Sequence, residues 1–305
     1  MVENAAAAHF FSLFLLRNRA HNQYNTGAMS QSSSFLINGR FEGGISPLDR
    51  GLAYGDGVFR TLQHNGYPYC WGMHYHRLEA DCNALGIVCP SADALLDDIA
   101  RLQGSEQNSV IKIIVTRGES LRSYAVPPLA QPTRIVIKTA MPQYPDSYFQ
   151  QGVTLHLCET RLARQPKLAG VKHLNRLENV LARMEWTDHQ IADGLMMDEG
   201  GDVIECTSAN LFARFGDIMV TPDLSASGVL GVTRERLMQL APKLGYSVEV
   251  KHLRLSELMD ADEVLMCNSL FGVWQVRQLS SHAWKAGTLA AQLRELLREQ
   301  DAISA

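Results

Sequence analysis

The chain lacks the features that mark metalloproteins, disulfide-stabilised proteins and membrane proteins. Its 305 residues contain only six cysteines, with no C-x-x-C pair and no spacing typical of a zinc site. His173 and His189 lie too far apart along the chain to form a pair of metal ligands. The apolar run HFFSLFLL is too short to span a bilayer, and no basic region precedes it. We therefore expect a cytoplasmic protein with reduced cysteines, no metal and no membrane association.

The chain also lacks a block of basic residues. Its formal net charge is -4 and its isoelectric point is near 6.2. A protein that binds nucleic acid or anionic lipid over a broad surface would carry a basic patch. We therefore expect no nucleic-acid partner, and a small molecule is the favoured ligand.

The length and the hydrophobic content, 46%, are sufficient for two domains with cores of their own. Residues 1–33 are largely polar after the short apolar run, so we expect them to form a disordered N-terminal extension. A smaller α+β domain is expected over residues 34–143. The stretch MPQYPDSYFQQG carries two prolines, so residues 144–152 are the expected linker. A larger domain of mixed strands and helices is expected over residues 153–305.

The smaller domain shows both strand and helix signals. Asn-Gly pairs interrupt apolar runs in SFLINGRFE and in GVFRTLQHNGYPYCW, which is typical of hairpins. SVIKIIVTRG and TRIVIKTA read as further strands. The stretches MHYHRLEADCNALG and SADALLDDIARLQG have the helical period and end at glycine.

The larger domain contains a lysine that lies just before an apolar helical pattern. A helix is expected to begin near Leu174, and Lys172 precedes it in AGVKHLNRLENV. A solvent-exposed lysine is one interpretation of this position, and a lysine with a function is the other. The apolar residues that recur at helical spacing predict a buried stripe on this helix: Leu177, Val180, Leu181 and Met184.

Three more features allow either a structural or a functional interpretation. In SASGVLGVTRERL, glycine and threonine at a helix start suit an anion, but they also suit an ordinary cap. Glu205 lies among apolar strand residues in GDVIECTSANLF, where a charge needs a partner unless it faces water. Arg77 in HYHRLEA is either a surface residue or a phosphate ligand.

Seven motifs, taken in order, resemble the fold-type IV pyridoxal-phosphate enzymes. This group includes the branched-chain aminotransferases, the D-amino acid aminotransferases and 4-amino-4-deoxychorismate lyase. The similarity runs from about Phe35 to Leu279, and the motifs are DRGLAYGDGVF, HYHRL, VTRG, GVKHLNRLENVLAR, VIECTSANLF, GVLGVTRERL and EVLMCNSLFGV. The resemblance implies an α+β or α/β fold of the D-amino acid aminotransferase type. Its two domains would hold the cofactor in the cleft between them.

The resemblance also implies roles for single residues. Lys172 is expected to bind the aldehyde of pyridoxal 5'-phosphate, because an amine in a partly apolar site is more easily deprotonated. Glu205 is expected to face the pyridine nitrogen and keep it protonated. The expected phosphate ligands are Arg77, the backbone at Val232 and Thr233, and Ser269.

The surroundings of Lys172 favour the lyase branch of this group. KHLNRLENVLAR, MCNSLFGVWQV and TRGESLRSYAVPP are each similar to segments of the lyases. The resemblance implies conversion of 4-amino-4-deoxychorismate to 4-aminobenzoate and pyruvate in a homodimer, a step of folate biosynthesis. A D-amino acid or branched-chain aminotransferase of the same fold is the alternative, and a non-enzymatic protein would lack the Lys172 and Glu205 pair. The substrate is expected to contact Arg117, Arg122, Tyr124 and Asn268.

Overall fold

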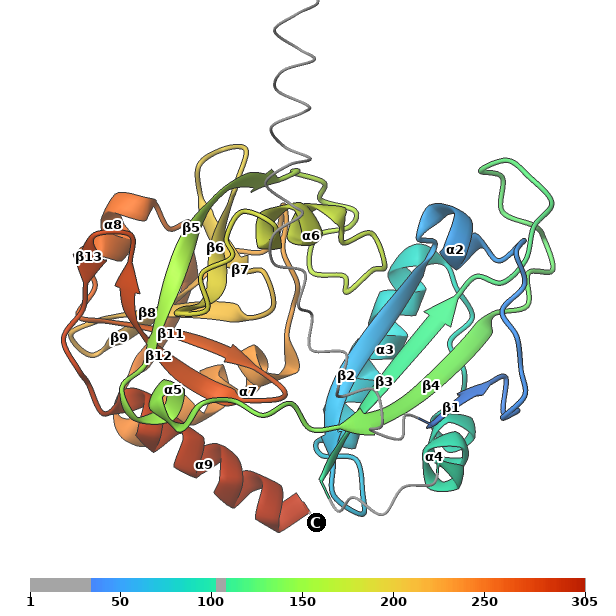
Figure 1. The fold of residues 1–305 in the computed structure, drawn as a ribbon, viewed down its shortest axis with the longest axis horizontal. Coiled ribbons are helices and arrows are strands. Elements are labelled where there is room, and N and C mark those ends of the chain that lie inside the picture. The colour runs from blue at the N-terminus through green and yellow to red at the C-terminus, as the bar shows by residue number, and fades with distance from the viewer. Residues whose placement is uncertain (1–33, 103–107, 305) are drawn as a thin grey trace, which may run out of the picture. The chain divides into compact units, whose positions relative to one another are not determined.

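The computed structural model describes residues 34–102 and 108–304, whose contacts form one compact unit. The expected extension over residues 1–33 lies outside the described residues. Two separate β-sheets organise the described part of the chain (Figure 1). No helix within the described ranges is long and apolar enough to cross a membrane.

The smaller sheet has four antiparallel strands in the order β1-β4-β3-β2. The expected Asn38-Gly39 turn follows β1, with both residues at positive φ, and the Asn65-Gly66 pair follows β2. The two turns are therefore confirmed, but each is followed by a single antiparallel bridge, Ile37 with Arg40 and His64 with Pro68, and not by the second strand of a hairpin. The elements of this part are β1 (Ser34–Ile37), α2 (Arg50–Tyr54), β2 (Gly57–His64), α3 (Trp71–Leu85), α4 (Ala92–Arg101), β3 (Ser109–Thr116) and β4 (Thr133–Ala140).

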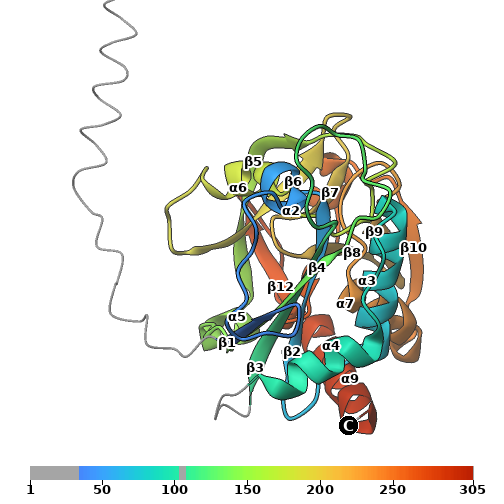
Figure 2. The ribbon, with the colours of Figure 1, turned by 90° about the vertical axis from the view of Figure 1, so that its right-hand side faces the viewer.

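Helices α3 and α4 lie against this sheet, as Figures 1 and 2 show. The Ser91 side chain accepts a hydrogen bond from the Ala94 N–H and begins α4, and Gly86 ends α3 in the left-handed conformation. The sheet and the helices share one apolar core, in which Leu62, Leu95 and other side chains are fully buried. Each such side chain contributes roughly 1.5–3 kcal/mol of burial free energy.

The larger sheet has nine strands and mixed direction, with the order β10-β9-β8-β11-β12-β5-β6-β7 and β13 paired to β12. Its parallel pairs are β10 with β9, β12 with β5 and β5 with β6. The strands are β5 (Val153–Leu162), β6 (Ile191–Asp198), β7 (Val203–Cys206), β8 (Asn210–Phe215), β9 (Ile218–Pro222), β10 (Ser247–Lys251), β11 (Glu263–Asn268), β12 (Gly272–Leu279) and β13 (His282–Ala283).

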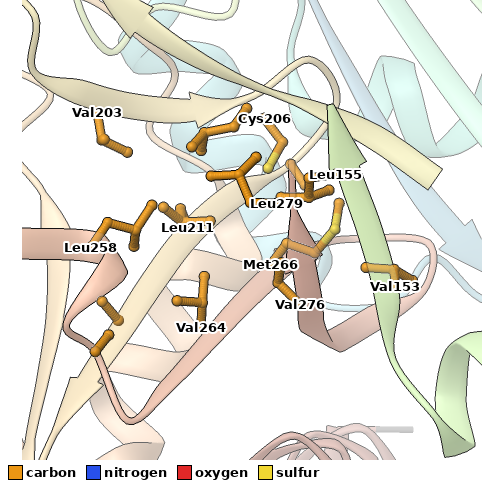
Figure 3. Close-up of a cluster of buried hydrophobic side chains, with 14 of the residues drawn as sticks. Val153, Leu155, Val203, Cys206, Leu211, Leu258, Val264, Met266, Val276 and Leu279 are labelled. Atoms are coloured by element: carbon orange, nitrogen blue, oxygen red, sulfur yellow. The ribbon is translucent and has the colours of Figure 1, made fainter. Parts of the chain in front are cut away.

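Apolar side chains from many elements form the core of the larger sheet. Figure 3 shows labelled core residues from β5, β7, β8, α8, β11 and β12, among them Leu155, Leu211 and Met266. The helices that accompany this sheet are α5 (Asp146–Gln150), α6 (Leu177–Arg183), α7 (Val232–Leu240), α8 (Leu255–Met259) and α9 (Leu289–Ser304), with a 3₁₀ turn, η2 (Ala241–Leu244), after α7.

The segment expected to be a linker contains the short helix α5. Its aromatic side chains pack on the larger sheet, because Tyr148 and Phe149 meet the Trp274 ring edge-on at 5.1 and 5.7 Å. Tyr144 packs on the same indole at 4.9 Å. The division into domains at residues 144–152 stays a prediction, and the segment itself is attached to the core of the larger sheet.

The prediction of a buried stripe on α6 is wrong. Its four apolar residues are exposed, at 75% for Leu177, 51% for Val180, 55% for Leu181 and 72% for Met184. The opposite face of α6 is held by polar contacts as well as by packing. Asn179 donates to the carbonyl of Thr207, and Glu178 accepts the backbone N–H of Ala163, while Ala182 is fully buried. The prediction of a helix was correct. The face that lies inward is the one that carries Glu178, Asn179 and Ala182.

Gly118 ends the TRG motif in a conformation that only glycine adopts without strain. Its φ is +88°, and a Cβ at this position would lie 1.8 Å from the carbonyl oxygen of Gln131. We predict that Gly118→Ala lowers the free energy of unfolding by about 1–3 kcal/mol. Urea denaturation measures the change. The control is Gly44→Ala, since a Cβ on Gly44 meets no atom within 4 Å; equal midpoints for the two variants would contradict the prediction.

Candidate active site

A cavity of about 340 Å³ is lined by residues from both sheets and from α7. Phe59 and Arg60 of β2 line one side, and His74 of α3 lies beside them. The other walls come from the larger sheet and from the segments that join it to α6 and α7. Six residues predicted from the sequence line this one cavity: Lys172, Glu205, Val232, Thr233, Asn268 and Ser269.

Lys172 is held in the cavity by its backbone. Its carbonyl accepts the Phe59 N–H at 2.9 Å, and Leu174 donates to the Gly57 carbonyl at 2.9 Å, so this segment pairs with β2. Gly57 permits the approach, because a Cβ there would lie 2.8 Å from the Leu174 side chain. The Lys172 Nζ lies 4.7 Å from the centre of the Phe59 ring.

The surroundings of Lys172 favour the neutral amine. Burial, followed by the positive charges of Arg60 and Arg176, lowers the pKa of Lys172 to about 8. Glu205 and Asp81 oppose this shift. A neutral amine is a nucleophile and a proton acceptor, so this lysine is prepared for both roles near neutral pH.

Glu205 lies on β7 and is only 4% exposed. Its Oε2 accepts the Val229 N–H at 2.9 Å and lies 3.4 Å from the Asn210 side-chain amide. Burial raises the pKa of Glu205, while the charges of Arg176 and Lys172 act in the opposite direction. A buried carboxylate of this kind prefers a cationic or hydrogen-bonding partner in the cavity.

The first turn of α7 forms another wall. Gly231 caps this helix without a side-chain hydrogen bond, and the hydroxyl groups of Thr233 and Ser269 lie 3.3 Å apart beside it. A Cβ on Gly231 would lie 2.1 Å from Asn210 Oδ1, so the close approach of these segments requires glycine here. Free N–H groups and hydroxyls at a helix N-terminus suit a phosphate.

Arg77 does not line the cavity. Its guanidinium donates to Glu235 Oε2 at 2.9 and 3.0 Å, and Glu235 belongs to the first turn of α7. The structure therefore attaches Arg77 to the helix whose N-terminus lines the cavity. The charge of Arg77 also lowers the pKa of Arg60.

The arginines expected to contact the substrate lie elsewhere. Arg117 is buried and donates to both oxygens of Asp56 and to the carbonyls of Leu85 and Gly86. Arg122 and Tyr124 are exposed on the loop after β3, and neither lines the cavity. Arg117, Arg122 and Tyr124 therefore do not line the cavity that contains Lys172.

Asn268 does line the cavity, but much of its amide is already bonded. Its Oδ1 accepts the N–H groups of Leu270 and Phe271, and its Nδ2 donates to the Ser208 carbonyl. An amide nitrogen carries two N–H groups, and these bonds use one of them.

Sequence reasoning missed four polar residues of the site. Arg60, Arg176 and Asn210 line the cavity, and Asp81 bonds to Arg60 and to the Lys172 backbone. Arg60 lies between Phe59 and Thr61 in a strand-like run, and no residue pattern near it marks it as functional. Arg176 and Asn210 lie within motifs quoted above, four residues after Lys172 and five residues after Glu205. Within residues 34–102 and 108–304 no group of His, Cys, Asp and Glu could hold a metal ion.

Comparison with known proteins assigns the family. Residues 57–279 match the family described as amino-transferase class IV. The chain belongs to this family. Its members depend on pyridoxal phosphate, and the chain has the corresponding fold-type IV architecture of mixed α/β content. The groups that line the cavity fit that cofactor: an amine, a buried carboxylate and a helix N-terminus with two hydroxyls.

Two relatives are lyases. The chain is 38% identical over 248 residues to an aminodeoxychorismate lyase of Vibrio harveyi, a match that covers 81% of this chain and 92% of that protein. It also resembles the crystal structure of 4-amino-4-deoxychorismate lyase from Pseudomonas aeruginosa, with a TM-score of 0.83 and 44% identity. That match covers 87% of this chain and 98% of the other. A D-alanine aminotransferase of Listeria monocytogenes is 25% identical over 83% of this chain and 89% of its own length.

Proposed function

We propose that this protein is a pyridoxal-phosphate-dependent lyase that converts 4-amino-4-deoxychorismate to 4-aminobenzoate and pyruvate. The observation that carries the proposal is the difference in similarity within one family. Two lyases match at 38% and 44% identity, whereas a third lyase matches at 26% and the aminotransferases among the curated relatives match at 25–28%. The reaction would supply 4-aminobenzoate for folate biosynthesis, and we assign it to the cytoplasm.

Residues of both sheets would hold the cofactor. Lys172 would bind its aldehyde, and Glu205 would accept a hydrogen bond from its ring nitrogen. The N–H groups of Val232 and Thr233, together with the Ser269 hydroxyl, would bind its phosphate. Arg77 would add positive charge at the same end, since Glu235 attaches it to the first turn of α7.

When bound, pyridoxal phosphate supplies a ring that accepts the electron pair left by proton removal next to the substrate nitrogen. Glu205 supports this role, because a buried carboxylate favours a protonated ring nitrogen. Lys172 removes the proton as a neutral amine and returns one as an ammonium group. Loss of the enolpyruvyl group leaves an aromatic ring, which makes the elimination strongly favourable.

The ligands of the substrate carboxylates suggest a homodimer. Arg122 and Tyr124 lie on one loop, and Arg50 supports the backbone of that loop. Arg50 is 4% exposed, and its guanidinium donates to the carbonyls of Ser123 and Tyr124. Arg122 and Tyr124 are exposed and lie outside the cavity of their own chain, and the Tyr124 ring lies 5.3 Å from the Tyr54 ring.

We propose that these two residues complete the cavity of a second subunit, where Asn268 would also contact the substrate. Arg117 would position the start of the loop. The exposed apolar side chains of α6, Leu177 and Met184 among them, would pack in the same interface.

The reaction itself is the first test. The purified protein with 4-amino-4-deoxychorismate is expected to release pyruvate, which lactate dehydrogenase and NADH detect by absorbance. The control assay uses D-alanine or L-leucine with 2-oxoglutarate and measures transamination. Rapid transamination without pyruvate release from aminodeoxychorismate would replace the lyase by the aminotransferase alternative and would leave the cofactor site intact.

Glu205→Gln is expected to keep the cofactor bound but to lower kcat by about 10²–10³-fold, because a neutral amide does not keep the ring nitrogen protonated. Steady-state kinetics and the visible absorbance spectrum measure the two effects. Lys172→Ala is the matched comparison, and it should lose both turnover and the absorbance of lysine-bound cofactor. Wild-type kcat in Glu205→Gln would show that the carboxylate has only a structural role.

Shared sites in a dimer predict complementation between inactive variants. Lys172→Ala and Arg122→Ala should each have little activity alone. After denaturation and refolding as a mixture, they should regain about a quarter of wild-type activity, since half the dimers are mixed and each has one intact site. No recovery in mixed dimers, confirmed by affinity tags on the two variants, would place Arg122 in the cavity of its own chain or outside the site.

A further inference from the structure

Arg60 is a buried cation that the proposed reaction does not use. It lies on β2, is 2% exposed and lines the same cavity as Lys172. One terminal nitrogen of its guanidinium, Nη2, donates to Asp81 Oδ2 and to the Arg77 carbonyl, and the other, Nη1, lies 3.5 Å from the Leu230 carbonyl. Its Nε–H is buried with no partner among the described residues. Such a group is costly to bury, so its retention calls for an explanation.

Asp81 connects this cation to the reactive lysine. The carboxylate lies on α3, and its Oδ2 accepts both the Arg60 guanidinium and the backbone N–H of Lys172, the latter at 3.2 Å. The carbonyl of Lys172 is held on the other side by the Phe59 N–H. Both polar groups of the Lys172 backbone are therefore fixed, one by a side chain and one by β2.

The charged groups around the Lys172 amine have opposite effects on its pKa. After burial, Arg60 is the first of the charges that lower this pKa, and Arg176 is the next. Glu205 and Asp81 raise it. His74 also lies close enough to interact with Lys172, although burial lowers the pKa of His74 to about 3 and keeps its ring neutral at physiological pH.

We propose that Arg60 and Asp81 form a clamp that positions Lys172 and sets the fraction of its amine that is neutral. Asp81 fixes the lysine backbone, and the Arg60 charge opposes the rise in the pKa of Asp81 that burial causes. The guanidinium also repels a proton on Lys172. Both are positioning residues, and the inference rests on the proposed function only in taking Lys172 as the reactive amine.

The two members of the clamp act on Lys172 with opposite sign. A nearby cation disfavours the ammonium form, so loss of the Arg60 charge should raise the pKa of Lys172. A nearby anion favours the ammonium form, so loss of the Asp81 charge should lower it. A purely structural pair would have no reason to produce opposite shifts.

The test measures the Lys172 amine directly in the full-length protein after hydroxylamine has removed any cofactor. Trace labelling with acetic anhydride from about pH 6 to about pH 11, followed by peptide mass spectrometry, gives the midpoint of its titration. The wild-type midpoint should lie at about 8. Arg60→Met should raise it by about one pH unit, Asp81→Asn should lower it by a similar amount, and the double variant should return near wild type.

A rise of one unit reduces the neutral fraction of the amine at pH 7 by about tenfold. Arg60→Lys keeps the charge and should leave the midpoint unchanged, so it and Asp81→Asn still test the clamp if Arg60→Met does not fold. The matched controls are Arg134→Met and Asp98→Asn, which break a partly buried ion pair between β4 and the helix α4 that packs on it. These controls should not move the midpoint.

Shifts of the same sign in Arg60→Met and Asp81→Asn, or no shift in either of these two variants when it folds, would overturn the clamp. The titration of Lys172 and the assay for pyruvate release give independent results. Opposite shifts in a protein that releases no pyruvate would support the clamp and would reject only the lyase function. Pyruvate release with unshifted midpoints would reject only the clamp.

Discussion

The backbone pairing between β2 and residues 172–174 places Lys172 in a cavity that both sheets line. Two hydrogen bonds of 2.9 Å, from Phe59 to Lys172 and from Leu174 to Gly57, attach this segment to the smaller sheet. The chain then continues into α6, which packs on the larger sheet. Neither sheet has a complete site of its own, because Arg60 comes from one, and Glu205 and the first turn of α7 come from the other.

The sequence predicted much of the fold and the centre of the site because those signals are local. Asn-Gly pairs marked the turns after β1 and β2, and Gly86 marked the end of α3. The order of motifs was sufficient to identify the family, and with it Lys172, Glu205 and the first turn of α7.

The remaining residues depend on contacts between distant parts of the chain. Arg117 resembles a substrate ligand in sequence, yet it is bonded to Asp56, which lies 61 residues earlier. The helical period of the apolar residues on α6 predicted a buried face. In the structure the face that carries Asn179 lies inward and bonds to the Thr207 carbonyl, and the apolar residues are exposed. Arg60 lies on β2 and Asp81 lies on α3, 21 residues later. No pattern within β2 indicates that the Arg60 guanidinium and the Lys172 N–H would share one oxygen of Asp81.

The walls of the cavity come from both sheets, so a ligand that fills it contacts both. A ligand that binds only the folded chain raises the free energy of unfolding by about 2.7 kcal/mol when its free concentration is a hundred times its Kd. Pyridoxal phosphate would thus act on the lifetime of the protein as well as on its chemistry. In a cell with little pyridoxal phosphate, chains without the cofactor would unfold more often and be degraded sooner. The amount of this protein would then depend on the concentration of the cofactor.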